Sequence, residues 1–232
     1  MAAEKDLSAL CAGHRQRLRE RFINSGLSGF AEHEVIEFLL TFAIPRRDVK
    51  NLAKIILQRF GSIANVLDAS PDELAMISGV GENTIALIKL VRAMNDKYME
   101  TSLKSSDVLH SHEQLINFLR MKLGNRRKEC FFVLFLDKQR RLLHTLNVPG
   151  TVDKVAVFPN EIAVETLRCH ASSVIIAHNH PGGNMCPSSA DIEITQTIQM
   201  ALSCIGVPLL EHYLIVGDKY VRLLELSEDF HS

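Results

Sequence analysis

The segment AHNHPGGNMCPSSAD, which ends at Asp191, concentrates side chains that can bind a metal ion. Alternate residues of an extended strand point to the same side, so His178 and His180 can face one ion if the preceding strand continues through both. A turn at the proline and glycines, followed by a helix that starts near Ser188, would return Asp191 to the same place. Two imidazole nitrogens and one carboxylate oxygen leave a tetrahedral zinc ion one position for water, as in catalytic zinc sites.

The same residues also have a purely structural interpretation. Ser188-x-x-Asp191 matches a capping box, in which the serine oxygen and the carboxylate satisfy backbone N–H groups at a helix start. Paired histidines also end strands without any metal. The combination of HxHP, a glycine turn and SxxD is more specific than either part and favours a metal site. Cys186 lies between the ligands, and a thiolate there would close the fourth position and make the site structural.

Two regions with different periodicities surround this segment. Apolar residues recur at three- and four-residue intervals in 35–40, 49–60 and 83–94, which predicts an all-α domain over residues 1–100. The polar stretch 101–109 is predicted to be a linker. Residues 110–232 mix expected strands with two main helices, which predicts a three-layer α/β domain. The strands are expected at 130–136, 141–148, 172–178, 209–217 and 219–226, and the helices at 160–171 and 190–205.

Composition narrows the function classes. The chain of 232 residues carries 26 Lys and Arg against 27 Asp and Glu, so any surface that binds DNA must be a local patch. Its five cysteines form no CxxC pair, which indicates reduced thiols. No apolar run approaches the roughly 18 residues that a membrane span needs. The N-terminus MAAEKDLSAL lacks a signal pattern, so we expect a cytoplasmic protein without a membrane partner.

These motifs resemble those of a known family. HNHP-x-G-x4-S-x-x-D is similar to the JAMM motif of the MPN (JAB) metalloproteases, and the whole chain, with its N-terminal helices, resembles the bacterial RadC proteins. The resemblance implies a cytidine-deaminase-like three-layer MPN domain. It also implies one zinc ion per chain, bound by His178, His180 and Asp191, and an oxyanion stabilised by Ser188.

In this family a glutamate just before a hydrophobic strand activates the zinc-bound water, and the resemblance assigns that role to Glu129, ahead of CFFVLFLD. Residue types alone leave four competitors, namely Glu161, Glu165, Glu193 and Glu211. The family usually has aspartate where Glu211 precedes His212, and often serine where Gly182 follows HNHP. We expect His212 to be a buried residue that orients a ligand, with direct metal binding as the alternative.

The helical region carries a candidate site for nucleic acid. Ser78-Gly79-Val80-Gly81 separates two apolar helices, and glycines at a helix start let backbone N–H groups meet a phosphate. This pattern resembles a helix-hairpin-helix, which RadC proteins carry, so Gly79, Gly81 and Lys89 are candidate DNA contacts. An ordinary αα-hairpin is the alternative. The arginines in 14–21 and the basic residues in 44–54 add positive charge, although such runs are usually solvated surface.

Three hypotheses for the function follow. The first is a zinc-dependent hydrolase of the JAMM type that cleaves peptide or isopeptide bonds in a protein or peptide substrate. The second is a DNA-associated scaffold or binding protein, in keeping with the DNA-repair label that RadC proteins carry. The third, a metal-dependent nuclease, is less favoured because phosphodiester cleavage often uses two metals and no second carboxylate cluster is evident. A zinc deaminase would need HxE and PCxxC, which the chain lacks.

Overall fold

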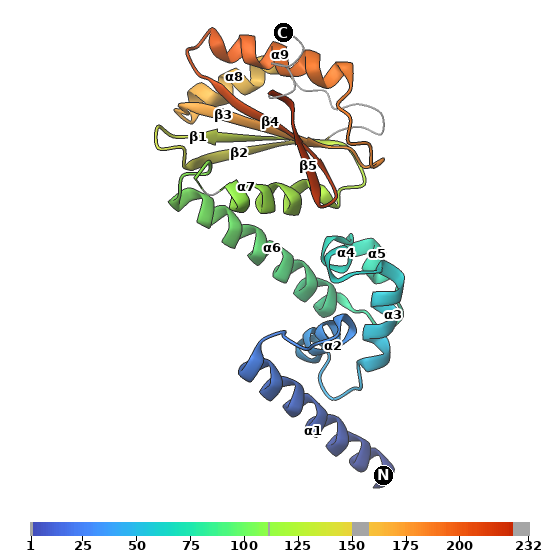
Figure 1. The fold of residues 1–232 in the computed structure, drawn as a ribbon. Coiled ribbons are helices and arrows are strands. Elements are labelled where there is room, and N and C mark those ends of the chain that lie inside the picture. Colours follow the sequence, from blue (N-terminus) through green and yellow to red (C-terminus); the bar gives the residue numbers. More distant parts are fainter. Residues whose placement is uncertain (1, 111, 150–157, 225–232) are drawn as a thin grey trace. The chain divides into compact units, whose positions relative to one another are not determined.

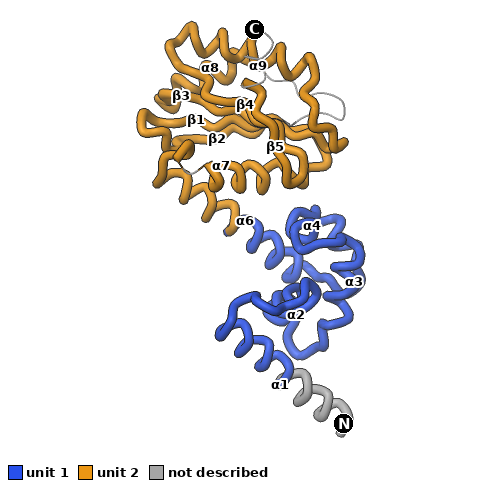
Figure 2. Tube along the Cα trace, viewed as in Figure 1, with its two compact units in different colours: residues 1–94 blue, residues 95–232 orange. Residues whose placement is uncertain are grey.

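The structure, a computed structural model, describes residues 2–110, 112–149 and 158–224 (Figure 1). Within these ranges it describes the side chains of residues 13–110, 112–148 and 158–224. The chain forms two compact units, residues 1–94 and 95–232 (Figure 2). Each unit has a hydrophobic core of its own.

Unit 1 is helical, as predicted, and contains no strand among its described residues. Its core includes the fully buried Leu40, Ile56 and Leu74. The expected helix start at Ser70 is confirmed, because Ser70 and Glu73 form a capping box around Pro71. The helices are α1 (Ala2–Ser25), α2 (Glu32–Ala43), α3 (Lys50–Phe60), α4 (Ile63–Asp68), α5 (Pro71–Ala75) and α6 (Glu82–Ser105).

The polar stretch 101–109 differs from the predicted linker. Helix α6 continues through Ser105, and both Leu103 and Val108 are fully buried in the core of unit 2. The hydroxyl of Thr101 donates to the Lys97 carbonyl, and the hydroxyl of Ser105 donates to the Ser102 carbonyl. A helix therefore accommodates these hydroxyls by bonding them to its own carbonyls, and residues 101–105 are not a linker.

Unit 2 is built on a five-stranded sheet of order β2-β1-β3-β4-β5. The pair β3–β4 is parallel and the other pairs are antiparallel. The strands are β1 (Cys130–Leu136), β2 (Leu142–Pro149), β3 (Ser173–Asn179), β4 (Leu209–Val216) and β5 (Lys219–Arg222). The last strand is shorter than the expected 219–226, and positions 225 and 226 lie outside the described residues. The helical elements are α7 (His112–Leu119), the π-helical turn η1 (Arg120–Gly124), α8 (Pro159–Arg168) and α9 (Ser189–Ser203).

Helices cover both faces of this sheet, α7 on one side and α8 and α9 on the other (Figure 1). Alternate residues of β1 serve the two layers: Phe132 packs in the core with α7, whereas Phe131 packs in the core with Ile162 of α8 and Ile198 of α9. All seven residues of β1 are buried, as expected for a strand between two layers. The predicted α/β domain with three layers is thus confirmed.

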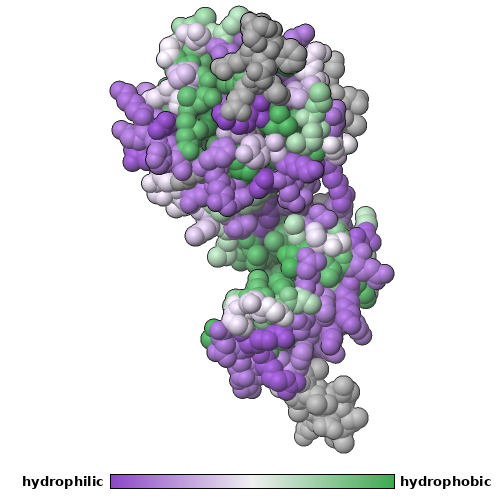
Figure 3. Space-filling model, viewed as in Figure 1, coloured by the Kyte–Doolittle hydropathy of each residue, from purple (hydrophilic) through white to green (hydrophobic). Residues whose placement is uncertain are grey.

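Surface composition is mixed. Hydrophilic side chains cover much of the face seen in Figure 3, and hydrophobic ones reach the surface in patches. In unit 1 the exposed apolar side chains include Phe42, Ile55, Met76 and Leu90. In the part of the chain that the structure describes, no helix has both the length and the apolar character to cross a bilayer.

A candidate metal centre at the end of β3

The two histidines of the opening segment lie at the end of β3. His178 is the next-to-last residue of that strand, and the N–H of His180, just beyond it, donates to the Ile215 carbonyl of β4 at 3.3 Å. The extended path thus continues through His180. Both imidazoles therefore lie on the side of the sheet that α9 covers, as the spacing predicts.

The chain then turns and starts α9 with Ser188 as its N-cap residue. The N–H of Asp191 donates to the Ser188 hydroxyl oxygen at 3.2 Å. Oδ2 of Asp191 accepts from the Ser188 N–H at 2.7 Å and from its hydroxyl at 2.6 Å. The predicted capping box is therefore present. It does not exclude the metal site, because the same carboxylate also faces the two histidines.

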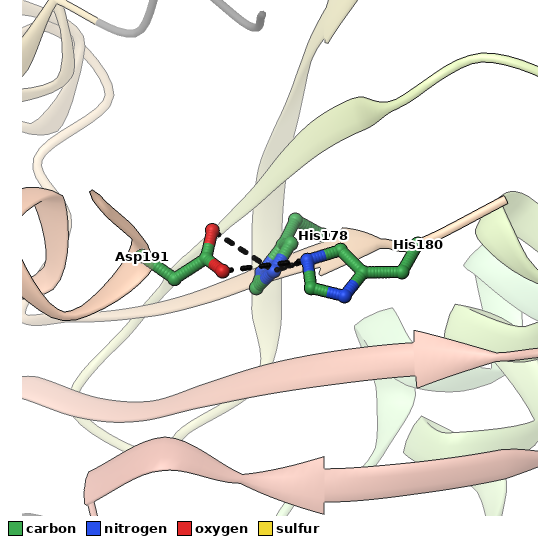
Figure 4. Close-up of side chains that lie close together, drawn as sticks. All are labelled: His178, His180 and Asp191. Carbon is green, nitrogen blue, oxygen red and sulfur yellow. Dashed lines mark hydrogen bonds and ion pairs between the residues drawn. The ribbon is translucent and has the colours of Figure 1, made fainter. Parts of the chain in front are cut away.

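Three side chains converge at this point (Figure 4). The Nε2 atoms of His178 and His180 lie 3.2 Å apart. Oδ1 of Asp191 lies 3.2 Å from Nε2 of His178, and Oδ2 lies 3.3 Å from Nε2 of His180. No other group of three His, Cys, Asp or Glu side chains with metal-binding spacing occurs among the described residues. Cys186 is outside the group and exposed.

The protein holds Asp191 in its charged form. Burial alone would raise the pKa of this carboxyl, but the hydrogen bond and charge of His178, together with the hydrogen bonds from Ser188, bring that pKa well below its usual range. The carboxylate is therefore an anion at neutral pH. An anion beside two imidazole nitrogens is a suitable donor set for a divalent cation.

His212 contacts His178 on the side of the ring that faces away from the candidate metal site. Its Nε2 is 2.8 Å from Nδ1 of His178, and its Nδ1 is 2.6 Å from the hydroxyl oxygen of Thr195 in α9. The side chain is fully buried, and burial, followed by the charge of His178, lowers the pKa of His212 well below its usual value. His212 thus contacts the candidate ligand His178, and it does not belong to the group of three side chains that converge.

Glu129 directly precedes β1 and is half-buried. The β1–β3 ladder pairs Phe131 with His178, and extending this register by two residues places Glu129 opposite His180. Among its competitors, Glu211 is buried and accepts hydrogen bonds from the N–H groups of His212 and Leu224 and from Arg222, so its role is structural. Glu161 and Glu193 are exposed, and Glu165 pairs with His144 and Arg168.

Asn179, between the two histidines, is a residue that the sequence reasoning missed. Its side chain is buried, and its Oδ1 accepts from the Cys130 N–H at 2.8 Å. Its Nδ2 donates to the carbonyls of Lys128 and Arg126 at 3.2 and 3.3 Å. Asn179 therefore holds peptide groups on both sides of Glu129. The alternation of an HNH strand end could have indicated this, because the middle residue must face the opposite layer, where a buried amide needs partners.

Comparisons with known proteins agree with this architecture. Residues 109–228 match the family described as RadC-like JAB domain, and residues 12–86 match the UPF0758 N-terminal family. The chain belongs to the RadC family. It is 38% identical to a UPF0758 protein of Fusobacterium nucleatum over 221 residues, which cover 92% of this chain and 95% of that one. A UPF0758 protein of Ruegeria pomeroyi is 37% identical over 94% of this chain and 96% of its own length. One of Rhodobacter capsulatus is 38% identical over 86% of this chain and 94% of its own length.

The RadC-like JAB domain contains every residue of the candidate metal centre. The candidate DNA contacts Gly79, Gly81 and Lys89 do not all fall within one family match. Gly79 and Gly81 fall within the UPF0758 N-terminal match, and Gly79 has a left-handed φ of 93°. Lys89 lies beyond that match, and its ammonium group donates to the carbonyls of Leu67 and Ala69. In this RadC-family chain the lysine thus serves the packing of unit 1.

Proposed function

We propose that this chain is a zinc-dependent hydrolase of the JAMM type that cleaves peptide or isopeptide bonds. The observation that carries the proposal is the convergence of His178, His180 and Asp191 from β3 and α9. Two nitrogens and one oxygen match the ligand preference of zinc, and a three-ligand set leaves a position for water or substrate. Since Cys186 stands outside the group, the set has the composition of a catalytic site.

The hydrogen bonds of His180 support a cation at this place. Its Nδ1 lies 3.0 Å from the Asn184 carbonyl oxygen, which can only accept, so the ring proton is on Nδ1. The lone pair of Nε2 then points at a second imidazole nitrogen and a carboxylate oxygen. A group of electron-rich atoms at such short distances is stabilised by a positive charge among them.

A bound zinc ion would polarise the scissile carbonyl and lower the pKa of a water molecule towards 7. The residues around it supply the proton transfers. We assign Glu129 as the general base that takes the proton of the attacking water and passes it to the leaving amine. Asn179 holds the backbone on both sides of this glutamate, so the position of the base is set from within the sheet.

Ser188 has a defined task in the resting protein. Its hydroxyl lies 2.6 Å from Oδ2 of Asp191, which is charged, so the hydroxyl donates its single proton there. Donation to an oxyanion, the role that the family resemblance implies, requires the hydroxyl to rotate away from Asp191. We propose that Ser188 holds Asp191 before substrate binds and turns to the substrate oxygen during the reaction.

Metal analysis of the purified protein is the first test. We expect one zinc per chain in the wild type and none in His178→Ala or Asp191→Ala. A wild-type protein that is free of metal and does not take up added zinc would overturn the proposal. Glu129→Gln is the second test: it should retain zinc and lose the hydrolysis of whichever peptide or isopeptide substrate the wild type cleaves in a screen.

A second candidate function is DNA binding by unit 1. The left-handed Gly79 in the turn before α6 is the observation in its favour. Glu82 in the first turn of α6 and the engaged Lys89 stand against it. Titration of the full chain with a fluorescent duplex at low and high salt decides the matter, because phosphate contacts weaken steeply with salt. A scaffold of this kind would keep its function in Glu129→Gln, and a nuclease would nick plasmid DNA in a metal-dependent way.

A further inference from the structure

We propose that Thr195 and His212 are positioning residues that hold a proton on Nδ1 of His178, so that Nε2 is the ring nitrogen that faces the metal site. This inference deepens the proposed function, since it rests on the metal site assigned there. Two uncharged side chains from α9 and β4 would then decide whether a histidine of β3 can act as a ligand.

The contacts form a continuous series. The Thr195 hydroxyl donates to the Asp191 carbonyl at 2.5 Å, one turn earlier in α9. The same hydroxyl oxygen lies 2.6 Å from Nδ1 of His212, and Nε2 of His212 lies 2.8 Å from Nδ1 of His178. Thr195, His212 and His178 are all buried, so water does not compete for these bonds.

Counting protons fixes the direction of each bond. A backbone carbonyl has no proton, so the single hydroxyl proton of Thr195 goes to Asp191. The hydroxyl oxygen must then accept, and Nδ1 of His212 therefore carries a proton.

His212 has only one ring proton to give. It is fully buried and its ring contacts are the Thr195 hydroxyl and the rings of His178 and Phe131, with no carboxylate in these contacts, so a charge on it would be costly. Its Nε2 is therefore an acceptor, and Nδ1 of His178 is the donor. With that proton on Nδ1, Nε2 is the nitrogen of His178 that is left to bind a metal ion, and it lies 3.2 Å from His180 and from Asp191.

The series also closes on the site itself. It begins at the backbone of Asp191 and ends at the ring of His178, so it links two of the three candidate ligands through β4. His180 needs no such relay, because its Nδ1 bonds directly to the Asn184 carbonyl. A change at Thr195 should therefore disturb His178 and leave His180 unchanged, which gives the experiment an internal reference.

Thr195→Val tests the relay, since valine keeps the branched shape and removes the hydroxyl. Thr195→Ser should restore the wild-type behaviour because it returns the hydroxyl. The matched control is Thr197→Val, in the same helix: the Thr197 hydroxyl also bonds to the carbonyl four residues earlier, that of Glu193, but it is exposed and contacts no histidine.

The first measurement is the nitrogen chemical shifts of the imidazoles in the zinc-free full-length protein, which report the tautomer of each ring. We expect protons on Nδ1 of His178 and of His212 in the wild type, in Thr195→Ser and in Thr197→Val. Thr195→Val should show a mixed or reversed tautomer at these two rings and an unchanged His180. A wild-type protein whose His178 carries no proton on Nδ1 would overturn the inference.

The second measurement is zinc affinity, determined by competition with a chromophoric chelator. Loss of a partner behind a ligand typically weakens metal binding by about 10- to 100-fold, and we expect this weakening in Thr195→Val alone. Equal affinity of Thr195→Val and wild type would also contradict the relay. If the wild type binds no zinc, the proposed function fails, while the shifts of the metal-free protein still judge the tautomers.

Discussion

Asp191 serves a helix and a candidate metal site at the same time. Its N–H and Oδ2 close the capping box with Ser188, while Oδ1 faces His178 and Oδ2 also faces His180. The two interpretations that the sequence leaves open, helix cap and metal ligand, are thus satisfied together. Variants of Asp191 accordingly change helix stability as well as ligand number, and they need a partner variant that weakens the cap and keeps all three candidate ligands.

Ser188→Ala is that variant. We expect it to lower the free energy of unfolding by about 1 kcal/mol, the usual cost of removing an N-cap hydroxyl, and to leave one zinc per chain. Urea denaturation and metal analysis measure the two effects. Ser189→Ala, at the next and equally exposed position, is the control and should change neither. Loss of zinc in Ser188→Ala would mean that the cap is needed to hold the carboxylate in place.

Cys186→Ser is predicted to keep one zinc per chain, because Cys186 is exposed and lies outside the converging group. Metal analysis beside the wild type checks this. A variant that loses its zinc would show that the thiolate is a fourth ligand, and the site would then be a closed, structural one.

Spacing alone was sufficient to predict which residues converge, because His178, His180 and Asp191 lie on one strand end and one helix start that local rules describe. Asn179 was missed because its partners lie at the start of β1 and just before it. Thr195 was missed because its partner His212 lies in β4, which is also distant in sequence. The hydrogen bonds of Lys89 could not be predicted for the same reason: the two carbonyls that accept from it belong to residues around the end of α4.

The turn between β1 and β2 is stabilised by a single carboxylate, that of Asp137. Asp137 accepts from the N–H groups of Gln139 and Arg141 and pairs with the Arg141 guanidinium. Burial would raise the pKa of Asp137, but these hydrogen bonds outweigh it and the pKa is lowered. The stabilisation is therefore fully present above the unfolded pKa, near 3.9, and is lost as the pH falls through the lower folded value.

We expect Asp137→Asn to cost about 0.5–1 kcal/mol at pH 7, a modest figure because the turn is solvated. The difference from wild type should shrink when both proteins are unfolded by urea at pH 3. A difference that stays constant from pH 7 to pH 3 would show that the charge of Asp137 contributes nothing.

The turn before α6 offers a matched pair of glycines. Gly79 has a left-handed φ of 93°, and an added Cβ would meet only Leu52 at an ordinary 3.6 Å, so backbone strain alone should make Gly79→Ala cost about 1 kcal/mol. Gly81 has no left-handed φ and no atom within 4 Å of an added Cβ. Gly81→Ala should stay within about 0.5 kcal/mol of the wild type in urea denaturation. If both substitutions lower the free energy of unfolding equally, the left-handed φ of Gly79 is not what constrains the turn.

The period of apolar residues predicted most elements of both units. It failed at 101–105, where serine and threonine suggested a linker although Leu103 is fully buried. Composition describes average polarity, whereas the buried positions of a helix occupy only one side of it. The order of the strands could not be predicted either, because pairing β3 between β1 and β4 depends on contacts between distant segments.

At the scale of the whole molecule, the two units keep separate cores and the candidate metal centre belongs to one of them. Ile56→Ala, in the core of unit 1, should cost about 2–5 kcal/mol in that unit and leave the zinc content unchanged. Ile198→Ala, at an equally buried position within α9, is the counterpart and should weaken zinc retention on heating. Calorimetry and metal analysis on both variants separate the outcomes, and zinc loss in Ile56→Ala would contradict the separation.

The HNH end of β3 also favours one register of this strand in the sheet. His178 and His180 face the α9 layer and Asn179 faces the opposite layer, where it makes three hydrogen bonds. Slippage of β3 by one residue would exchange these faces, since side chains alternate with a period of two. The imidazoles would enter the layer against α7 and the amide would lose its partners, so misaligned pairing is penalised on both faces at once. The residues proposed for chemistry would thereby also favour the correct strand register during folding.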